Sequence, residues 1–303
     1  ETREFLDLAA PQGLGAAEVR AIHGVTDGWP AALRITALSF EGGRNPEELL
    51  RALTRSPRSI GGFLDELCAQ LPAELLGFLR ETSIVDRLSA PLCDAITARH
   101  DAAALLARLE RQQLVAPLDP EHTVYACHQL FREYLAQQLA TQPAGDVAAL
   151  HRRASAWYET LGYESESVKH LLAAGDTSAA LVRIADCAER MVESGDLLTL
   201  LHWEQQLRAK GIALPLALQL SIIWAEALTL SGAQAQQHIT AVEEAVAARD
   251  DPEARIVRRE CLALRATTRA LADDTTQAYE LEQRYDPQGQ DRPLVRDSVC
   301  NGA

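Results

Sequence analysis

The sequence predicts a mainly α-helical protein built of three consecutive parts. Apolar residues recur with a helical period along most of the 303 residues. Hydrophobic residues make up 47% of the chain and aromatic residues only 5%, a mix that favours helices. Strand-prone runs occur at one place only, within residues 114–127. A chain of this length has room for two or three cores.

The first part, residues 1–62, is predicted to be a small helical domain. A short amphipathic helix is expected at 16–24. A second helix is expected to begin near Pro30, because proline is favoured in the first turn of a helix. Another is expected after Asn45, which is a good N-cap residue.

The second part, residues 63–142, mixes helices with one predicted hairpin. Two strand-prone runs, 114–118 and 123–127, flank a turn-rich stretch at 119–122. Helices are expected at 63–70, 72–81, 89–98, 101–112 and 128–140. Several helices, a small hairpin and a closing helix are typical of a winged-helix domain.

The third part, residues 143–303, is predicted to consist of helical hairpin repeats. The pairs Gly175-Asp176 and Gly195-Asp196 fit junctions in which Gly ends one helix and Asp caps the next. Helices are expected at 147–161, 164–174, 177–192, 196–209, 215–231, 234–249, 253–272 and 275–285. Units of roughly 35–45 residues indicate a solenoid of the tetratricopeptide-like type, although its strict consensus is absent.

The charge balance disfavours nucleic acid as a ligand. The net charge is −14, and residues 68–140 carry six Arg against nine acidic residues. An acidic surface repels phosphate, so we do not expect the winged helix itself to bind DNA. The six cysteines lack metal-ligand spacing and indicate free thiols in a reducing cytoplasm. No apolar run approaches the roughly 18 residues that span a membrane, so we expect no membrane contact.

Both ends of the chain indicate an internal fragment of a longer protein. The chain opens with Glu1 inside a helical pattern, and residues 298–303 resemble the start of another helix. We therefore expect truncation at both ends.

The sharpest local signal is Thr26-Asp27-Gly28-Trp29-Pro30-Ala31-Ala32-Leu33. A Gly, an aromatic residue and a helix-opening Pro form a compact turn whose ring could pack on a flat ligand. The local chemistry by itself favours an ordinary helix start with a core tryptophan.

This segment resembles the Thr-x-Gly-Trp-Pro-Ala-Ala-Leu segment of MalT-type regulators. These are large ATP-binding, LuxR-type activators within the STAND class of signalling ATPases. Further stretches resemble the family in the same order, at 79–94, 105–110, 125–131, 149–158 and 170–176. The resemblance covers roughly residues 1–210, and the remainder agrees in helical character only.

The resemblance implies a nucleotide-binding role for four residues. Gly28, Trp29 and Pro30 are similar to the Gly-x-Pro motif, in which the proline packs against adenine. His128 is similar to the winged-helix histidine that reaches the β-phosphate of bound ADP. A histidine at a helix start can donate a hydrogen bond to a phosphate oxygen. Cys127 departs from the residue type usual before this histidine, and the alternative for His128 is a packing or surface residue.

The chain also lacks parts of the family pattern. Neither a Walker A loop nor a Walker B strand end is visible, so we expect no catalytic residue and no metal site here. The resemblance implies that the full-length parent binds and slowly hydrolyses ATP, whereas this fragment alone binds neither ATP nor ADP. It also implies that DNA is bound only through a C-terminal helix-turn-helix that is absent from the chain.

The function implied is that of a regulatory fragment of an ATP-dependent transcriptional activator. It would couple nucleotide state, and sensing of a small-molecule inducer or regulatory protein on the repeats, to self-association. The alternative is a helical-repeat protein-interaction scaffold without a nucleotide role, since stacked helix pairs offer a concave surface.

Overall fold

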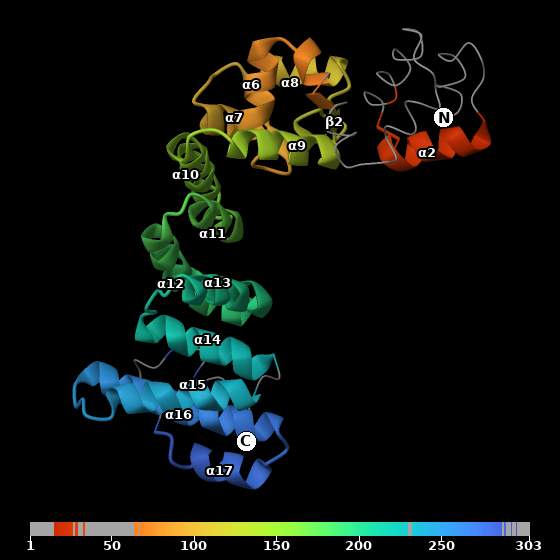
Figure 1. The fold of residues 1–303 in the computed structure, drawn as a ribbon. Coiled ribbons are helices and arrows are strands. Elements are labelled where there is room, and N and C mark those ends of the chain that lie inside the picture. The colour runs from red at the N-terminus through yellow and green to blue at the C-terminus, as the bar shows by residue number, and fades with distance from the viewer. Residues whose placement is uncertain are drawn as a thin grey trace. The chain divides into compact units, whose positions relative to one another are not determined.

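The chain folds into two compact units, residues 1–161 and 162–303 (Figure 1). The structure is a computed structural model, and it describes residues 15–26, 28, 29, 33, 64, 65, 67–229, 232–286, 288, 292 and 295. The predicted helix after Asn45, Pro30 itself and most of the first predicted domain lie outside these residues.

Helix α2 (Ala16–Thr26) confirms the first predicted helix. Its apolar residues Val19 and Ile22 are buried, as their spacing on one helical face predicts. Farther along, the backbone N–H of Leu33 donates to the carbonyl of Trp29 at 2.9 Å. This bond joins residues four apart, as in an α-helix, and Leu33 is helical.

Four helices of the first unit match the predicted ones to within about two residues. They are α6 (Ala73–Thr82), α7 (Ala90–Thr97), α8 (Ala102–Arg111) and α9 (Gln129–Ala140). Residues 64, 65 and 67–70 are helical as well. In α9, the side chains of Phe131, Leu135 and Leu139 are buried in the core of this unit, as the helical period predicts.

A three-stranded antiparallel sheet completes the winged-helix fold. Strands β2 (Val115–Pro117) and β3 (Val124–Cys127) form the predicted hairpin, with Val115 opposite Cys127. The side chain of Asp119 closes the turn, because it accepts hydrogen bonds from the backbone N–H groups of Thr123 and Val124, both at 2.9 Å. The third strand, β1 (Leu88–Ser89), pairs with the other side of β3 and was not predicted.

Helix α10 (Ala144–Thr160) packs in the first unit. Its residues Leu150 and Ala154 belong to the same core as α9, and the Nε of Arg153 donates to the carbonyl of Ile96 in α7. The sequence predicts this helix as part of the repeat region, with that region starting at residue 143. The second compact unit instead starts at Gly162.

The second unit consists of successive helices that each contact the next along the chain. They are α11 (Glu164–Ala173), α12 (Thr177–Ser194), α13 (Leu197–Ala209), α14 (Leu216–Leu228), α15 (Gly232–Val246), α16 (Pro252–Leu271) and α17 (Thr275–Glu282). Helix α14 also contacts α12 and α16, so these three alternate helices lie next to one another. This is the helical-hairpin arrangement that the sequence predicts.

The two Gly-Asp pairs lie at helix junctions, as predicted. Gly175 and Gly195 have positive φ angles of 73° and 81°, which glycine adopts without strain. Asp176 caps α12 by accepting a hydrogen bond from the N–H of Ala179 at 3.3 Å. Asp196 holds the N-cap position of α13 but makes no capping bond with its side chain.

Candidate functional site

The indole of Trp29 stacks on the imidazole of His128. Their ring centroids lie 5.0 Å apart and their planes are inclined by 11°. Phe131, one turn into α9, meets the indole at 5.2 Å with a tilt of 32°. Trp29 is only 6% exposed, so its ring packs into the core of the first unit. The structure thus brings the two motifs singled out in the sequence into direct contact.

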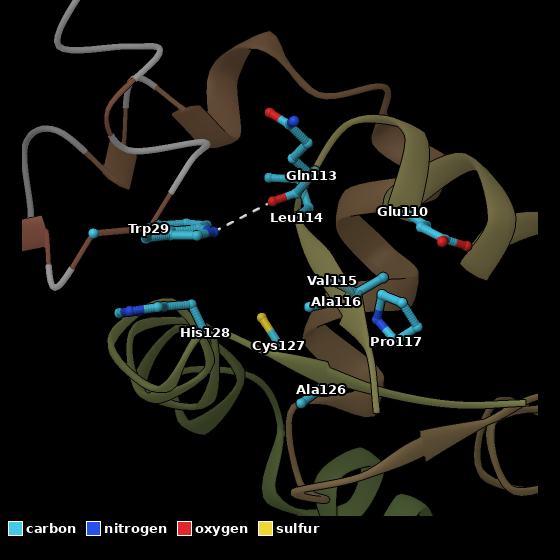
Figure 2. A pocket seen from close by; sticks show the side chains of 11 residues that line it. Trp29, Glu110, Gln113, Leu114, Val115, Ala116, Pro117, Ala126, Cys127 and His128 are labelled. Carbon is cyan, nitrogen blue, oxygen red and sulfur yellow. Dashed lines mark hydrogen bonds between the residues drawn. The ribbon is translucent and has the colours of Figure 1, made fainter. Parts of the chain in front are cut away.

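His128 is held in place by the sheet and by the helix that follows. It directly follows β3, whose pairing with β2 fixes the strand end, and it occupies the N-cap position of α9. Its backbone carbonyl accepts the first helical bond, from the N–H of Arg132 at 2.9 Å. The imidazole is therefore carried at the junction of a strand and a helix, with Trp29 on its face (Figure 2).

The indole of Trp29 is anchored by a backbone carbonyl in the turn that follows α8. Its Nε1 donates to the carbonyl oxygen of Gln113 at 3.3 Å (Figure 2). Gln113 has a φ of 60°, the left-handed region that residues other than glycine seldom adopt. Bonds from the N–H of Gln113 to Glu110 and from the N–H of Leu114 to Leu109 hold this turn. The turn ends α8 and aims the Gln113 carbonyl at the indole.

A cavity of about 470 Å³ lies beside the stacked rings. Gly28, Trp29 and His128 line it together with strand β2 and Glu110 (Figure 2). Gly28 has a positive φ of 71°, which a residue with a side chain would adopt only with strain. The volume lies in the range of small-molecule sites, roughly 300–1,000 Å³.

The polar groups of the cavity make it electrostatically asymmetric. Glu110 contributes a carboxylate, which the Nδ1 of His122 approaches to 2.6 Å. No Lys or Arg is among the described residues that line the cavity.

Cys127 also lines the cavity, and its thiol is chemically quiet. Burial raises the pKa of Cys127 to about 12, and the charge of Arg132 only partly opposes this. The group is thus a neutral thiol at physiological pH and serves as an apolar wall.

The four predicted site residues have different outcomes. Gly28, Trp29 and His128 come together around one cavity, whereas Pro30 lies outside the described residues. Gln113, whose backbone carbonyl accepts the hydrogen bond from the indole, is not among the predicted site residues. No local sequence signal marks it, because any residue type carries a carbonyl.

The cysteines and the clusters of possible metal ligands form no further site among the described residues. Cys68, Cys93, Cys127, Cys187 and Cys261 are free thiols. Among the described residues, no group of three or more His, Cys, Asp or Glu side chains is arranged to hold a metal ion. None of the described helices is long and apolar enough to cross a membrane.

Comparisons with known proteins agree with this fold. The family model of the MalT winged helix domain matches residues 64–147. The serine/threonine-protein kinase PknK of Mycobacterium tuberculosis is 33% identical over 285 residues, which cover 93% of this chain and 26% of that protein.

Two regulators are similar over a shorter stretch. The HTH-type transcriptional regulator MalT of Vibrio parahaemolyticus is 25% identical over 221 residues, covering 69% of this chain and 24% of that protein. The MalT protein of Vibrio cholerae is 26% identical over 208 residues, covering 65% and 22%. The chain thus spans about a quarter of the length of the curated relatives it matches. The family-model match and the fold show that residues 64–147 form a winged-helix domain of the MalT type, in a chain that is similar to MalT-type regulators over about two thirds of its length.

Proposed function

We propose that this chain is the regulatory segment of a MalT-type protein and that it responds to a nucleotide at the cavity beside Trp29 and His128. One observation carries the proposal: the two motifs that resemble the nucleotide-contacting motifs of the family meet face to face, at a cavity of ligand size. Two independent motifs that converge on one concave site favour a binding role.

The charges of the cavity support one orientation of the ligand. His128 can donate a hydrogen bond to a phosphate oxygen, and its position at the start of α9 adds the positive end of the helix dipole. Glu110 would repel a phosphate at the other end. The phosphates of ADP would therefore lie at His128, and the adenine contact is assigned to Pro30 by resemblance.

The remaining phosphate contacts would come from elsewhere in the longer protein. Phosphoryl groups are commonly held by Lys, Arg or a bound magnesium ion. The described lining of the cavity supplies neither cation, since it contains no Lys or Arg. We accordingly assign binding and slow hydrolysis of ATP to the full-length protein, and sensing of the bound nucleotide to this segment.

The output of the full-length protein is a separate question. Similar segments occur in proteins named as transcriptional regulators and in one named as a kinase. The same regulatory segment would therefore serve different outputs. For a transcriptional output in the cytoplasm, we propose that an inducer or regulatory protein binds the repeats, that self-association follows, and that DNA is bound through a separate helix-turn-helix.

The test is His128→Ala in the full-length protein that contains this segment. We expect faster release of bound ADP and higher basal activity, because the closed state would lose a contact that it makes only with ADP. His100→Ala is the matched control, since His100 is exposed and does not line the cavity. Unchanged ADP release and basal activity in His128→Ala would refute the assignment.

A helical-repeat scaffold without a nucleotide role is the second candidate. The burial of Trp29 favours it, because a ring that fills the core has a purely structural use. On this candidate, His128→Ala lowers the stability of the first unit and leaves ADP release unchanged. The same experiment therefore separates the two functions.

A further inference from the structure

The second unit contains a buried carboxylate at the contact of two helices. Glu260 of α16 is 3% exposed and Trp224 of α14 is 1% exposed. The Nε1 of Trp224 donates to an oxygen of Glu260 at 2.9 Å. An ionised carboxylate at such a position is costly unless a cation accompanies it.

Arg292 supplies this cation. Its Nε donates to one oxygen of Glu260 at 3.2 Å, and one terminal nitrogen donates to the other oxygen. The second terminal nitrogen donates to the hydroxyl of Ser221 on α14, at 2.9 Å. All three nitrogens of the guanidinium are therefore bound, and the carboxylate is held by two parallel bonds.

The arrangement fits a guanidinium and not an ammonium group. Two parallel bonds to one carboxylate need two donors in a fixed plane, which arginine has and lysine lacks. Ser221 is oriented for the third bond, since its hydroxyl donates to the carbonyl of Ala217 at 3.3 Å and so keeps its lone pairs available.

Further acidic groups face the same point from α12. Burial lowers the pKa of Arg292, and the carboxylates of Glu189 and Glu193 oppose this shift. One oxygen of Glu189 is buried and has no hydrogen-bond partner in the described part of the chain.

The occupant comes from a different part of the chain than the site. Ser221, Trp224 and Glu260 lie in the body of α14 and α16, whereas Arg292 follows α17, the last complete helix described. Val295, close to Arg292 in the chain, is buried in the same core. We propose that Ser221, Trp224 and Glu260 form a guanidinium-binding site, and that Arg292 is its internal occupant, which fastens the segment after α17 to the repeats.

The proposal predicts chemical rescue of an emptied site. Arg292→Ala should lower the melting temperature of the second unit in the full chain. Millimolar methylguanidinium should then restore at least about half of the loss, and the effect should saturate, because a bound ligand stabilises the folded state. Methylammonium at equal concentration should restore far less. Arg284→Ala is the matched control, since Arg284 is exposed. Its melting temperature should match that of the parent chain and should not rise with methylguanidinium.

Two further variants keep the test decisive. In the double variant Glu260→Gln with Arg292→Ala, methylguanidinium should have no saturable effect. If Arg292→Ala does not fold, Arg292→Lys keeps the charge and loses the planar fork, and it should also be stabilised by methylguanidinium. Absence of saturable rescue, or equal rescue by methylammonium or in the double variant, would overturn the proposal.

Discussion

The rings of Trp29 and His128 stack within 11° of parallel, with centroids 5.0 Å apart. Trp29 is buried, and its Nε1 donates a hydrogen bond to the Gln113 carbonyl. The indole is therefore held in place and supports one face of the His128 imidazole. Any ligand contact of His128 is therefore coupled to the packing of Trp29. Trp29 belongs to the core of the first unit, and both residues line its cavity.

Replacement of Trp29 should separate these two roles. Trp29→Ala removes a buried ring and should lower the free energy of unfolding of the first unit by about 3–5 kcal/mol. Trp29→Phe keeps an aromatic face for His128 and loses the bond to Gln113. Trp29→Phe should therefore lower the free energy of unfolding by less, about 1–2 kcal/mol. Calorimetry that resolves the transitions of the two units provides the measurement.

Trp157→Phe is the control for this series, because Trp157 lies in the same unit and is only half-buried. A loss in Trp29→Ala no larger than that in Trp157→Phe would show that the stacked ring contributes little to the core.

The helices and the hairpin could be predicted because their signals are local. The apolar period places Phe131 and Leu135 on the buried side of α9, and the turn residues at 119–122 mark the hairpin. Strand β1 could not be predicted, since two residues are too few for an alternating pattern. The packing of α10 against the first unit is equally invisible, because the periodicity of a helix shows which face is buried but not against which partner.

The site was predicted only in part, for a similar reason. The motifs at Gly28-Trp29 and at His128 could be found from their residues, and the structure adds that they touch. The anchor at Gln113 depends on a backbone conformation at the end of α8, with a φ of 60° that the residue type does not favour. Tertiary packing fixes such a turn, so no sequence pattern announces it.

The thiol of Cys127 should react slowly although it lines the cavity. Its pKa is raised to about 12 by burial, whereas an ordinary cysteine has a pKa of about 8.5. At about pH 8 the thiolate fraction, and with it the alkylation rate, should be on the order of a thousandfold lower in the folded chain than in the unfolded one. Peptide mass spectrometry after iodoacetamide treatment, with and without denaturant, measures this ratio. Equal rates in the two states would contradict the assignment of Cys127 as an unreactive, apolar part of the cavity wall.

The N-cap of α16 should make the second unit sensitive to acid. Hydrogen bonds from the Arg249 side chain, and then from the N–H of Ala254, lower the pKa of Asp251 to about 2. An unfolded aspartate has a pKa of about 3.9, so the stabilisation is present above that value and is lost as the pH falls toward about 2.

Asp251→Ala should accordingly melt about 2–4 °C below the parent chain at neutral pH. The difference should narrow as the pH falls from about 4 to about 2, where the parent loses the same charge. Melting curves of both chains across this range give the comparison. A difference in melting temperature that stays constant with pH would mean that the charge of the Asp251 carboxylate does not contribute to stability.

Glu226 should have the opposite effect on the pH dependence. Burial raises its pKa, and the charge of Glu204 adds to this, while His238 and Arg208 act against it. The Nδ1 of His238 lies 2.9 Å from one carboxylate oxygen. The folded pKa is above the unfolded one, so the contribution to stability is present at low pH and is lost as the pH rises through the folded pKa.

Glu226→Gln removes the buried charge and keeps an acceptor for the N–H of His238. At about pH 8 the variant should be more stable than the parent by about 1 kcal/mol, because the buried charge of Glu226 is gone. The advantage should shrink as the pH falls, because Glu226, whose pKa is raised by burial, then gains a proton. Denaturant unfolding of the second unit at several pH values is the measurement, and Glu244→Gln on the exposed side of α15 is the control. A variant less stable than its parent at about pH 8 would show that the ion pair with His238 outweighs the cost of burying Glu226.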